Sequence, residues 1–298
     1  MLCVGIGGGG DVVGALSAAG LAAAAGVPAV LGGLTWERRP IDPLPGPRPL
    51  ADVTGVDAID EAAALAGPGA SGPGGFRFAE GRMAEVLGEP TVLLDPTGGP
   101  AAVAHGLARA ADALGCDVVV LLDVGGDALA HGDEPGLSSP LADAIVIAAA
   151  PALAAAGFTV LGAVFGVGCD GELTPDEILA RLAEVRAAGG DLGDHAPDAA
   201  TLDRLAAAVA AVPTEASAMA LRCARGERGD THIRDGRRTV HLTAEGGRVY
   251  FFDPEAALRS AARLARAIRD ARDLHDADRI LTGLGVRTEL RYETEAAA

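Results

Sequence analysis

The chain has 298 residues, enough for one large α/β domain or two modest ones, and 49% of them are hydrophobic. Its formal net charge of −17 argues against nucleic acid and anionic membranes as partners, because both attract a basic surface. An anionic small molecule would therefore have to be held by arginine side chains, backbone N–H groups or a metal ion.

Lysine is absent, so all 24 basic residues are arginine. This excludes a standard P-loop lysine, Schiff-base catalysis and lysine-linked pyridoxal phosphate. The cysteines form no CxxC pair, which predicts buried free thiols in a reducing cytoplasm rather than a zinc knuckle. No charged segment precedes the first apolar residues, as a signal peptide would require, and we expect a cytoplasmic protein.

Strands and helices alternate along the first part of the chain. An apolar run at the start ends in glycines, and a helical pattern follows from Val12 to Ala25. Residues 57–65 fit either a helix or a strand, and 67–75 (GPGASGPGG) reads as a flexible connector or a lid. Thr174, Pro175 and Glu177 form the capping box of a helix. The pattern predicts further strands at 27–34, 90–94, 117–122 and 158–165, and helices at 78–87, 101–114 and from 141 onward.

From about Asp191 the pattern changes to helices joined by polar turns. Helices are predicted at 198–211, 214–224 and 254–273, strands at 239–243 and 248–252, a loop at 226–238, and frayed residues at the end. Together the elements predict an α/β fold with a mostly parallel, Rossmann-like three-layer sheet and a C-terminal helical or α+β extension. We expect residues 1–190 to form a glycine-rich ligand-binding core and 191–298 to pack on it, with one continuous domain as the alternative.

Four of the predicted strands end in glycine-rich turns that carry acidic residues. These turns are 5–11, 95–99, 123–127 and 166–172. Ligands of open parallel sheets bind beyond the carboxyl ends of the strands, so the four turns are expected to converge on one site.

The first of these turns can hold an anion, because a strand, a glycine turn and a helix present free backbone N–H groups. Glycine permits a left-handed backbone and a close approach of the ligand. Arginines in the proline-rich segment 36–48 can add charge, and a purely structural turn is the alternative. The residues expected to bind a phosphate or nucleotide are Gly7, Gly8, Gly9, Gly10, Asp11, Arg38, Arg48, Thr97, Gly98, Gly125, Gly126 and Ser139.

The same glycines leave a dinucleotide site open as an alternative. Gly5, Gly7 and Gly10 satisfy the GxGxxG spacing of proteins that bind NAD(P) or FAD. In those proteins an acid at the end of the second strand binds the ribose, whereas residues 30–34 contain none and Glu37 comes late. The fingerprint is therefore incomplete.

The loop after the strand at 117–122 is the best candidate for metal or acid–base chemistry. Asp123 and Asp127 offer the hard oxygen ligands that Mg²⁺ prefers. Asp127, His131 and Glu134 are the candidate catalytic acids or bases, since neighbouring titratable groups shift one another's pKa. A solvated acidic loop is the structural alternative.

Several segments together resemble one family of archaeal and actinobacterial proteins, the domain of unknown function 1152 family. The resemblance rests on Gly5–Asp11, Trp36–Arg38, Asp42–Arg48 and Asp123–Asp127, and continues through Glu134, Ser139–Ala144 and Thr214–Glu215. It covers nearly the whole chain. It implies no established activity, and it marks these loops as the segments to follow.

The sequence favours an enzyme that acts on a phosphorylated metabolite or nucleotide with help from Mg²⁺. Transfer, ligation and hydrolysis all stay open as reaction types. The alternatives are an oxidoreductase that uses NAD(P) or FAD, and a non-catalytic ligand sensor or assembly subunit. The expected partner is an anionic small molecule, not nucleic acid or a membrane, and a homo-oligomer stays open.

Overall fold

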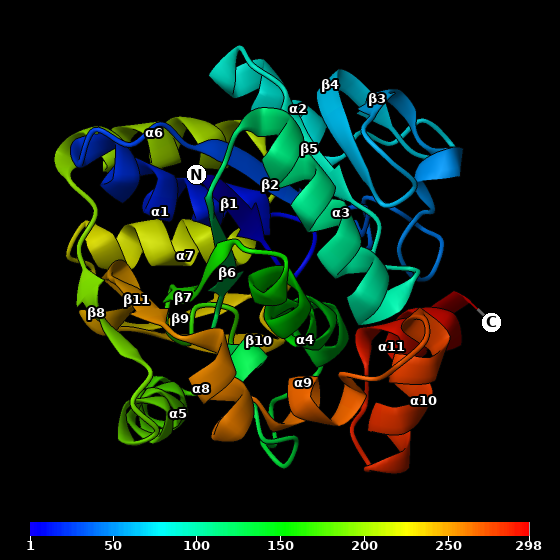
Figure 1. Ribbon diagram of the computed structural model, residues 1–298. Coiled ribbons are helices and arrows are strands. Elements are labelled where there is room, and N and C mark those ends of the chain that lie inside the picture. The colour runs from blue at the N-terminus through cyan, green and yellow to red at the C-terminus, as the bar shows by residue number, and fades with distance from the viewer. Residues whose placement is uncertain (298) are drawn as a thin grey trace.

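The computed structural model describes residues 1–297 and confirms an α/β fold built on one nine-stranded sheet (Figure 1). The strand order is β3-β4-β5-β2-β1-β6-β7-β11-β8. The five central strands are parallel: β5 (Thr91–Leu94), β2 (Val30–Leu34), β1 (Leu2–Gly5), β6 (Val118–Val124) and β7 (Thr159–Phe165). Antiparallel strands extend both edges: β3 (Thr54–Ala58) and β4 (Ala63–Ser71) on one, and β11 (Val249–Phe252) and β8 (Asp191–His195) on the other.

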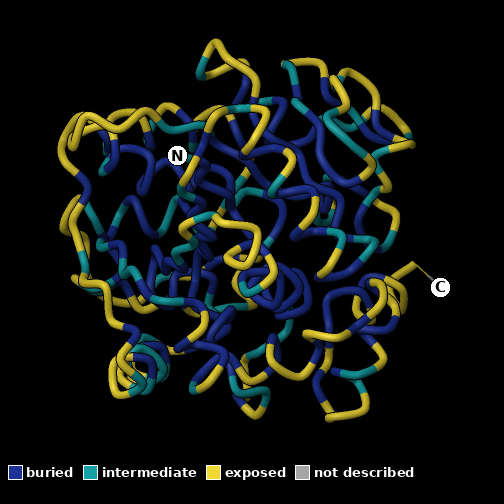
Figure 2. The backbone as a smooth tube through the Cα atoms, viewed as in Figure 1, coloured by how far each residue is buried: buried dark blue, intermediate teal, exposed yellow. Residues whose placement is uncertain are grey.

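Helices cover both faces of this sheet and complete three layers. One face carries α1 (Asp11–Ala24), α2 (Ala79–Leu87), α6 (Ala199–Ala211) and α7 (Glu215–Ala224). The other carries α3 (Gly99–Leu114), α4 (Pro140–Ala155), α5 (Pro175–Ala187), α8 (Pro254–Arg259), α9 (Arg263–Ile268) and α10 (Leu274–Gly283). The central strands and α4 are buried, whereas the outer surfaces of the surrounding helices are exposed (Figure 2).

Local sequence signals account for most of these elements. In β6, a run of valine and leucine is buried on both faces, as expected for a central parallel strand. At the start of α5, Thr174 Oγ1 accepts from the N–H of Glu177 at 3.3 Å, and the Glu177 carboxylate accepts from the N–H of Thr174 at 2.7 Å. The predicted capping box is therefore confirmed.

The predicted helix 254–273 is wrong as a single element. The chain forms the short helices α8 and α9 there instead, and the break at Ser260 has a non-helical backbone. Helix α10 begins only at Leu274, beyond the predicted range. Ala261 and Ala262 at the break are fully buried. The segment bends because its apolar residues must follow the curved surface of α4, against which α8, α9 and α10 pack.

Three other segments also differ from the prediction because tertiary pairing orders them. Residues 67–71 belong to strand β4, whose Ala66 and Ala70 pack with Phe78, so most of the expected flexible connector is a strand. The predicted loop 226–238 contains β9 (Gly229–Ile233), which pairs with β10 (Arg238–Leu242) as a hairpin. The expected frayed end forms helix α11 (Glu289–Ala297).

The order of the central strands creates a switch point between β1 and β6. From β1 the chain crosses through α1 to β2 on one side, whereas β6 and β7 lie on the other side. The turns after β1 and β6 therefore leave the same sheet edge in opposite directions, which opens a crevice where ligands of such folds bind. Within residues 1–297, no helix is both long enough and apolar enough to cross a membrane.

Candidate functional site

Three aspartates meet at this switch point. Asp11 opens α1 after the glycine turn, Asp123 ends β6, and Asp143 lies in the first turn of α4. One carboxylate oxygen from each lies within 4.8 Å of one from each of the others. Asp123 and Asp143 are each only 1% exposed. We call these three residues the aspartate triad.

Among the described residues, the hydrogen bonds of the triad leave one fully buried oxygen without a partner. Asp11 Oδ2 accepts from the N–H of Gly7 at 3.0 Å and of Val124 at 3.3 Å. Asp123 Oδ2 accepts from the N–H of Ala128 at 2.9 Å. Asp143 Oδ1 is buried and has no hydrogen-bond partner among the described residues. Buried polar atoms are nearly always paired, so this oxygen calls for an explanation.

Burial raises the pKa of every carboxyl group of the triad, because charged groups are poorly solvated inside a protein. The pKa of Asp11 rises to about 8, with the charge of Asp123 as a second cause. The pKa of Asp123 rises to about 6 through burial, which the N–H groups of Ala128 and Gly126 partly offset. The pKa of Asp143 is raised well above its usual value by burial and then by Asp123 and Asp11.

A second acidic group lies beside the triad and consists of Asp127, Asp170 and Glu172. The carboxylate of Glu172 is fully engaged. It accepts from the N–H groups of Ser138 at 2.7 Å and Ser139 at 2.8 Å, bonds the Ser139 hydroxyl, and pairs with Arg238 at 2.9 Å. Ser139 therefore serves this internal network.

Asp127, unlike Glu172, accepts no hydrogen bond on its carboxylate from residues 1–297. It is 6% exposed and begins the short 3-10 turn 127–129 after β6. Burial, followed by the charges of Asp143 and Asp123, raises its pKa well above the usual value. Asp127 is thus a carboxyl group whose hydrogen-bonding capacity is unused.

The glycine turn leaves backbone N–H groups unused. Gly8 and Gly9 have left-handed backbones, with φ of 76° and 54°. The N–H of Gly9 donates to the carbonyl of Trp36 at 2.8 Å, whereas the N–H groups of Gly8 and Gly10 find no acceptor in the described chain. A Cβ on Gly10 would lie 2.2 Å from Cβ of Thr214, so α7 packs directly on the turn.

Arg38 supports this turn. Its guanidinium donates to the carbonyl of Gly7 at 2.6 Å, lies 3.3 Å from Glu289 and 3.4 Å from Glu293, and stacks 4.5 Å from the centre of the Trp36 ring. Most of its donors are therefore committed to the protein itself.

Arg48 is likewise engaged within its own segment. It donates to the carbonyls of Leu44, Pro45 and Gly46 and pairs with Asp42 at 3.0 Å. Its guanidinium stabilises the proline-rich segment 36–48.

Two arginines that the sequence did not single out approach the site from the β9–β10 hairpin. Arg238 contacts Glu172, the carbonyl of Asp170 and the hydroxyl of Ser138. Arg234 lies in the hairpin turn and has only one ion pair, with Glu215 at 3.4 Å, among the residues described. Burial lowers its pKa, and the charges of Arg238 and Arg38 lower it further. Arg234 therefore has fewer contacts within the protein than Arg38 or Arg238.

His131 and Glu134 are bound to α5 instead of the triad. His131 Nε2 lies 3.0 Å from Glu184, and Glu134 pairs with Arg181 at 3.0 Å. Burial alone would raise the pKa of Glu134, but the N–H groups of His131 and Gly132 and the guanidinium of Arg181 outweigh it and lower that pKa. These contacts tie the loop after Asp127 to α5.

The turn after β5 also uses its polar groups internally. Asp95 accepts from the N–H of Leu50 at 2.9 Å and of Thr97 at 2.8 Å, and the carbonyl of Thr97 accepts from Leu274 at 2.9 Å. Thr97 and Gly98 follow β5, so they lie at the same sheet edge as the triad. Strand β2 stands between β5 and β1, and this turn is therefore separate from the turns that carry the triad.

Gly125 and Gly126 contribute close packing. A Cβ on Gly125 would lie 2.5 Å from the carboxyl carbon of Asp170, and one on Gly126 would lie 2.8 Å from Ile178. Both have positive φ, of 142° and 121°. The absence of side chains there lets the loop after β7 approach the end of β6.

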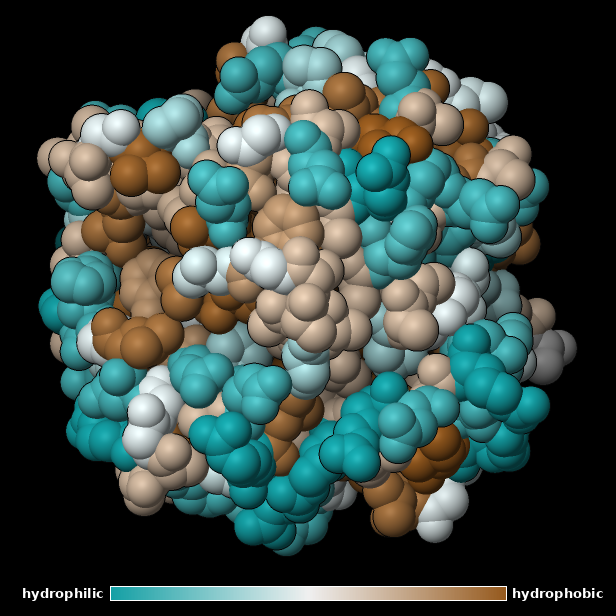
Figure 3. Space-filling model, in the orientation of Figure 1, coloured by the Kyte–Doolittle hydropathy of each residue, from teal (hydrophilic) through white to brown (hydrophobic). Residues whose placement is uncertain are grey.

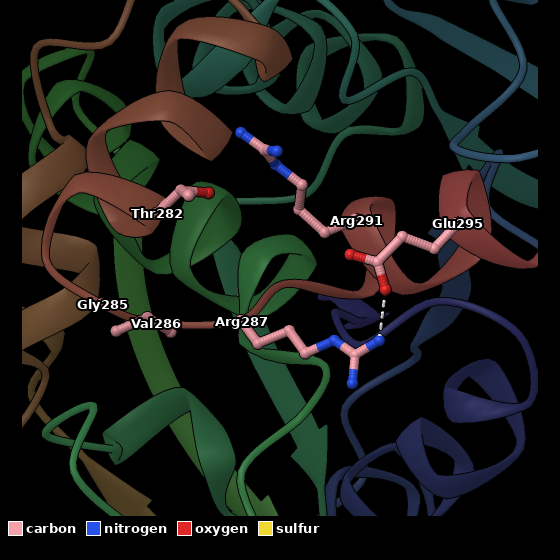
Figure 4. A pocket seen from close by; sticks show the side chains of 6 residues that line it. All are labelled: Thr282, Gly285, Val286, Arg287, Arg291 and Glu295. Atoms are coloured by element: carbon pink, nitrogen blue, oxygen red, sulfur yellow. Dashed lines mark hydrogen bonds and ion pairs between the residues drawn. The ribbon is translucent and has the colours of Figure 1, made fainter.

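A surface pocket lies elsewhere, between the end of α10 and helix α11 (Figure 4). It has a volume of about 230 Å³, and an ion pair between Arg287 and Glu295 at 2.5 Å crosses its rim. On the face in Figure 3, hydrophilic side chains gather along the lower part of the molecule, over the exposed arginines of α8 to α10. None of the triad residues lines that pocket.

The sequence-based site residues did not include Asp143, Arg234 and Arg238, and Asp170 and Glu172 were expected only as part of the acidic turn 166–172. For Asp143 a signal existed, because it is the single charged residue of the otherwise apolar segment 140–155.

No curated protein and no solved structure matches the chain. One family, described as a protein of unknown function (DUF1152), matches residues 2–297. The chain therefore belongs to the DUF1152 family, as its sequence motifs indicated.

Proposed function

We propose that this protein is an enzyme that acts on a phosphorylated metabolite or nucleotide with the help of a divalent cation. The observation that carries the proposal is the juxtaposition of unpaired donors and unpaired carboxylate oxygens at one switch point. The N–H groups of Gly8 and Gly10 lack acceptors, and Asp143 Oδ1 and the Asp127 carboxylate lack donors. A phosphate together with a cation would satisfy both.

The donors fit a phosphate because they combine a helix start with a guanidinium. Gly10 is the N-cap of α1 and has no side-chain cap, so its unpaired N–H lies at the positive end of the helix dipole. Arg234 has a weak partner and lies in the electrostatic range of Arg38 and Arg238. A phosphate has enough oxygens to engage both groups.

The carboxylates require a cation because a phosphate beside ionised aspartates would be repelled. A divalent ion between them would neutralise charge on both and position the phosphate for attack. Asp127, whose carboxyl group makes no internal hydrogen bond, is placed to donate or accept a proton. We propose this role for Asp127 rather than for His131 or Glu134, which are engaged by α5.

The dinucleotide alternative receives less support. The only acid soon after β2 is Glu37, which is 6% exposed and accepts from the N–H of Ala79 at 2.5 Å. The Glu37 carboxylate therefore already binds the start of α2. A ribose hydroxyl would have to displace the N–H of Ala79 to reach it.

Thermal unfolding in the presence of phosphorylated compounds tests the proposal. ATP, pyrophosphate and ribose 5-phosphate are added with Mg²⁺ or with EDTA, and ³¹P spectroscopy follows any conversion. At about 100 times Kd, a bound ligand raises the Tm by roughly 5 °C. Conversion that requires the cation supports an enzyme. The proposal fails if no phosphorylated compound raises the Tm.

Two neighbouring arginines provide a matched pair of variants. Arg234→Gln is expected to weaken ligand binding by about tenfold, the loss of one charge-assisted contact. Arg237→Gln removes the same charge from the same turn, but its side chain is 66% exposed, and its contacts are an ion pair with the exposed Asp235 and a hydrogen bond to the carbonyl of Arg234 at 2.8 Å. Equal losses in both variants would show a general charge effect and contradict the phosphate site.

A further inference from the structure

The aspartate triad has the composition of a cation site. All its candidate ligand atoms are carboxylate oxygens, which Mg²⁺ and Mn²⁺ prefer. Adjacent oxygens around one octahedral ion lie roughly 3 Å apart and opposite ones roughly 4 Å apart, because each bond is about 2.1 Å long. The candidate oxygens of the triad lie within 4.8 Å of one another, which is close to this range. Small side-chain rotations would therefore bring them to the spacing of ligands around one ion.

The unpaired oxygen of Asp143 is the second and independent sign of a ligand. It lies 3.4 Å from the position that a Cβ on Gly7 would take, and Asp11 Oδ2 lies 2.7 Å from that same position. Asp143 Oδ1 and Asp11 Oδ2 therefore lie close together beside the glycine turn, and Asp143 Oδ1 has no hydrogen-bond partner among the described residues.

The protein supplies little positive charge of its own to this space. Arg38 is the arginine whose charge lowers the pKa of Asp143, against the larger effect of burial, and its donors bind the carbonyl of Gly7 and the carboxylates of Glu289 and Glu293. Arg238 is committed to Glu172. The protein's own arginines therefore do not neutralise the negative charge of the triad, and an external cation could do so.

We propose that Asp11, Asp123 and Asp143 bind one divalent cation, with Mg²⁺ as the preferred ion. The three residues come from the ends of β1 and β6 and the start of α4, so the site forms only in the folded chain. The site differs from the expected pair of Asp123 and Asp127 by exchanging Asp127 for Asp11 and Asp143. It deepens the proposed function, on which its catalytic meaning rests, although cation binding itself is measured without a substrate.

The second acidic group does not form an equivalent site. Every oxygen of Glu172 is engaged by a serine or by Arg238, and Asp170 Oδ1 accepts from the N–H of Glu172 at 3.3 Å. One cation per chain is therefore expected.

Electron paramagnetic resonance of Mn²⁺ measures this directly, because the signal of the free ion decreases when it binds. Wild type is expected to bind one Mn²⁺ per chain, with Mg²⁺ as a competitor. Asp143→Asn and Asp11→Asn should each weaken binding by about tenfold or more, which is the scale of losses at metal sites. Asp117→Asn is the control, because Asp117 precedes the same strand β6 at its opposite end and is exposed.

Cleavage of the wild-type chain supplies a test that needs no variant. Fe²⁺ replaces Mg²⁺, and ascorbate with peroxide generates radicals that cut the backbone next to the ion. Cuts near residues 11, 123 and 143 are expected, and excess Mg²⁺ should prevent them. Cuts confined to other segments, or unchanged Mn²⁺ affinity in folded Asp143→Asn, would overturn the site. Failure of phosphorylated compounds to bind would leave these results unaffected and would contradict the proposed function alone.

Discussion

Glu289 and Arg38 form an ion pair at 3.3 Å that connects the last helix of the chain to the glycine turn. The Glu289 carboxylate also accepts from the N–H groups of Leu141 and Ala142, both at 2.9 Å, and so caps α4. Arg38 in turn donates to the carbonyl of Gly7. Helix α11 therefore positions both the turn and the helix that carries Asp143.

Removing the charge of Glu289 should destabilise the protein. Glu289→Gln weakens hydrogen bonds between buried charged groups, and we expect the free energy of unfolding to fall by about 1.5 to 3 kcal/mol. Urea unfolding measures the change. Glu295→Gln on the same helix is the control, since its partner Arg287 is exposed and such pairs contribute less than about 1 kcal/mol. Similar losses in both variants would contradict the positioning role of Glu289.

The contact between the glycine turn and α7 gives a second prediction. Gly10→Ala would place a Cβ 2.2 Å from Cβ of Thr214, and we expect a loss of about 1 to 3 kcal/mol from overpacking. Gly283→Ala, in α10, meets no atom within 4 Å and should instead stabilise the helix by about 0.5 to 1 kcal/mol. Thermal and urea unfolding of both variants decide the matter. A neutral Gly10→Ala would show that α7 moves away at little cost.

The predictable part of the structure is the part that local signals determine. The run of apolar residues in β6, the capping box of α5 and the helical patterns of α6 and α7 all depend on residues close in sequence, and these elements form as predicted. Of the four acidic turns that were expected to converge, those after β1, β6 and β7 do so, because carboxyl ends of parallel strands share one edge. The turn after β5 does not join them, since Asp95 binds Leu50 and Thr97.

The remaining features depend on contacts between distant residues. Glu289 and Glu293 are buried where they pair with Arg38, some 250 positions earlier, and accept from N–H groups of other distant segments, and no local pattern indicates that. The hairpin that carries Arg234 is glycine- and arginine-rich, so its sequence resembles a loop until β9 pairs with β10. Asp143 was missed because it lies within an apolar helix rather than in a turn.

The stability of the cation-free protein should fall as the pH rises from about 5 to 8. Burial raises the pKa of Asp123 to about 6, of Glu37 to about 7 and of Asp11 to about 8. A carboxyl group whose pKa is raised in the folded state favours folding when protonated. Its contribution is complete below its unfolded pKa of about 4 and is lost as the pH rises through its folded pKa.

Thermal unfolding in EDTA between pH 5 and pH 8.5 measures this effect, in steps of about half a unit so that each transition is resolved. Carboxyl groups with lowered pKa, such as Asp276, act mainly below about pH 4 and do not interfere. The hydrogen bond with Cys169 lowers the pKa of Cys223 to about 7, which adds stability above about pH 7, so the decisive interval is pH 5 to 7. Mg²⁺ should raise the Tm more at pH 8 than at pH 6, because it replaces the protons of the triad. A Tm in EDTA that is constant or rises over this interval would contradict the pKa shifts.

Asp127→Asn should separate chemistry from cation binding. The amide keeps the size of the side chain but cannot exchange a proton, so turnover of a phosphorylated substrate should fall by about 10²-fold or more, the usual contribution of a general acid or base. The affinity for Mn²⁺ should stay within about threefold of wild type, because ions in this cleft are held by the triad and not by Asp127. Asp133→Asn, an exposed position in the same loop, should leave both quantities unchanged. Loss of Mn²⁺ binding in Asp127→Asn would instead assign Asp127 to the metal and move the proton-transfer role to another residue.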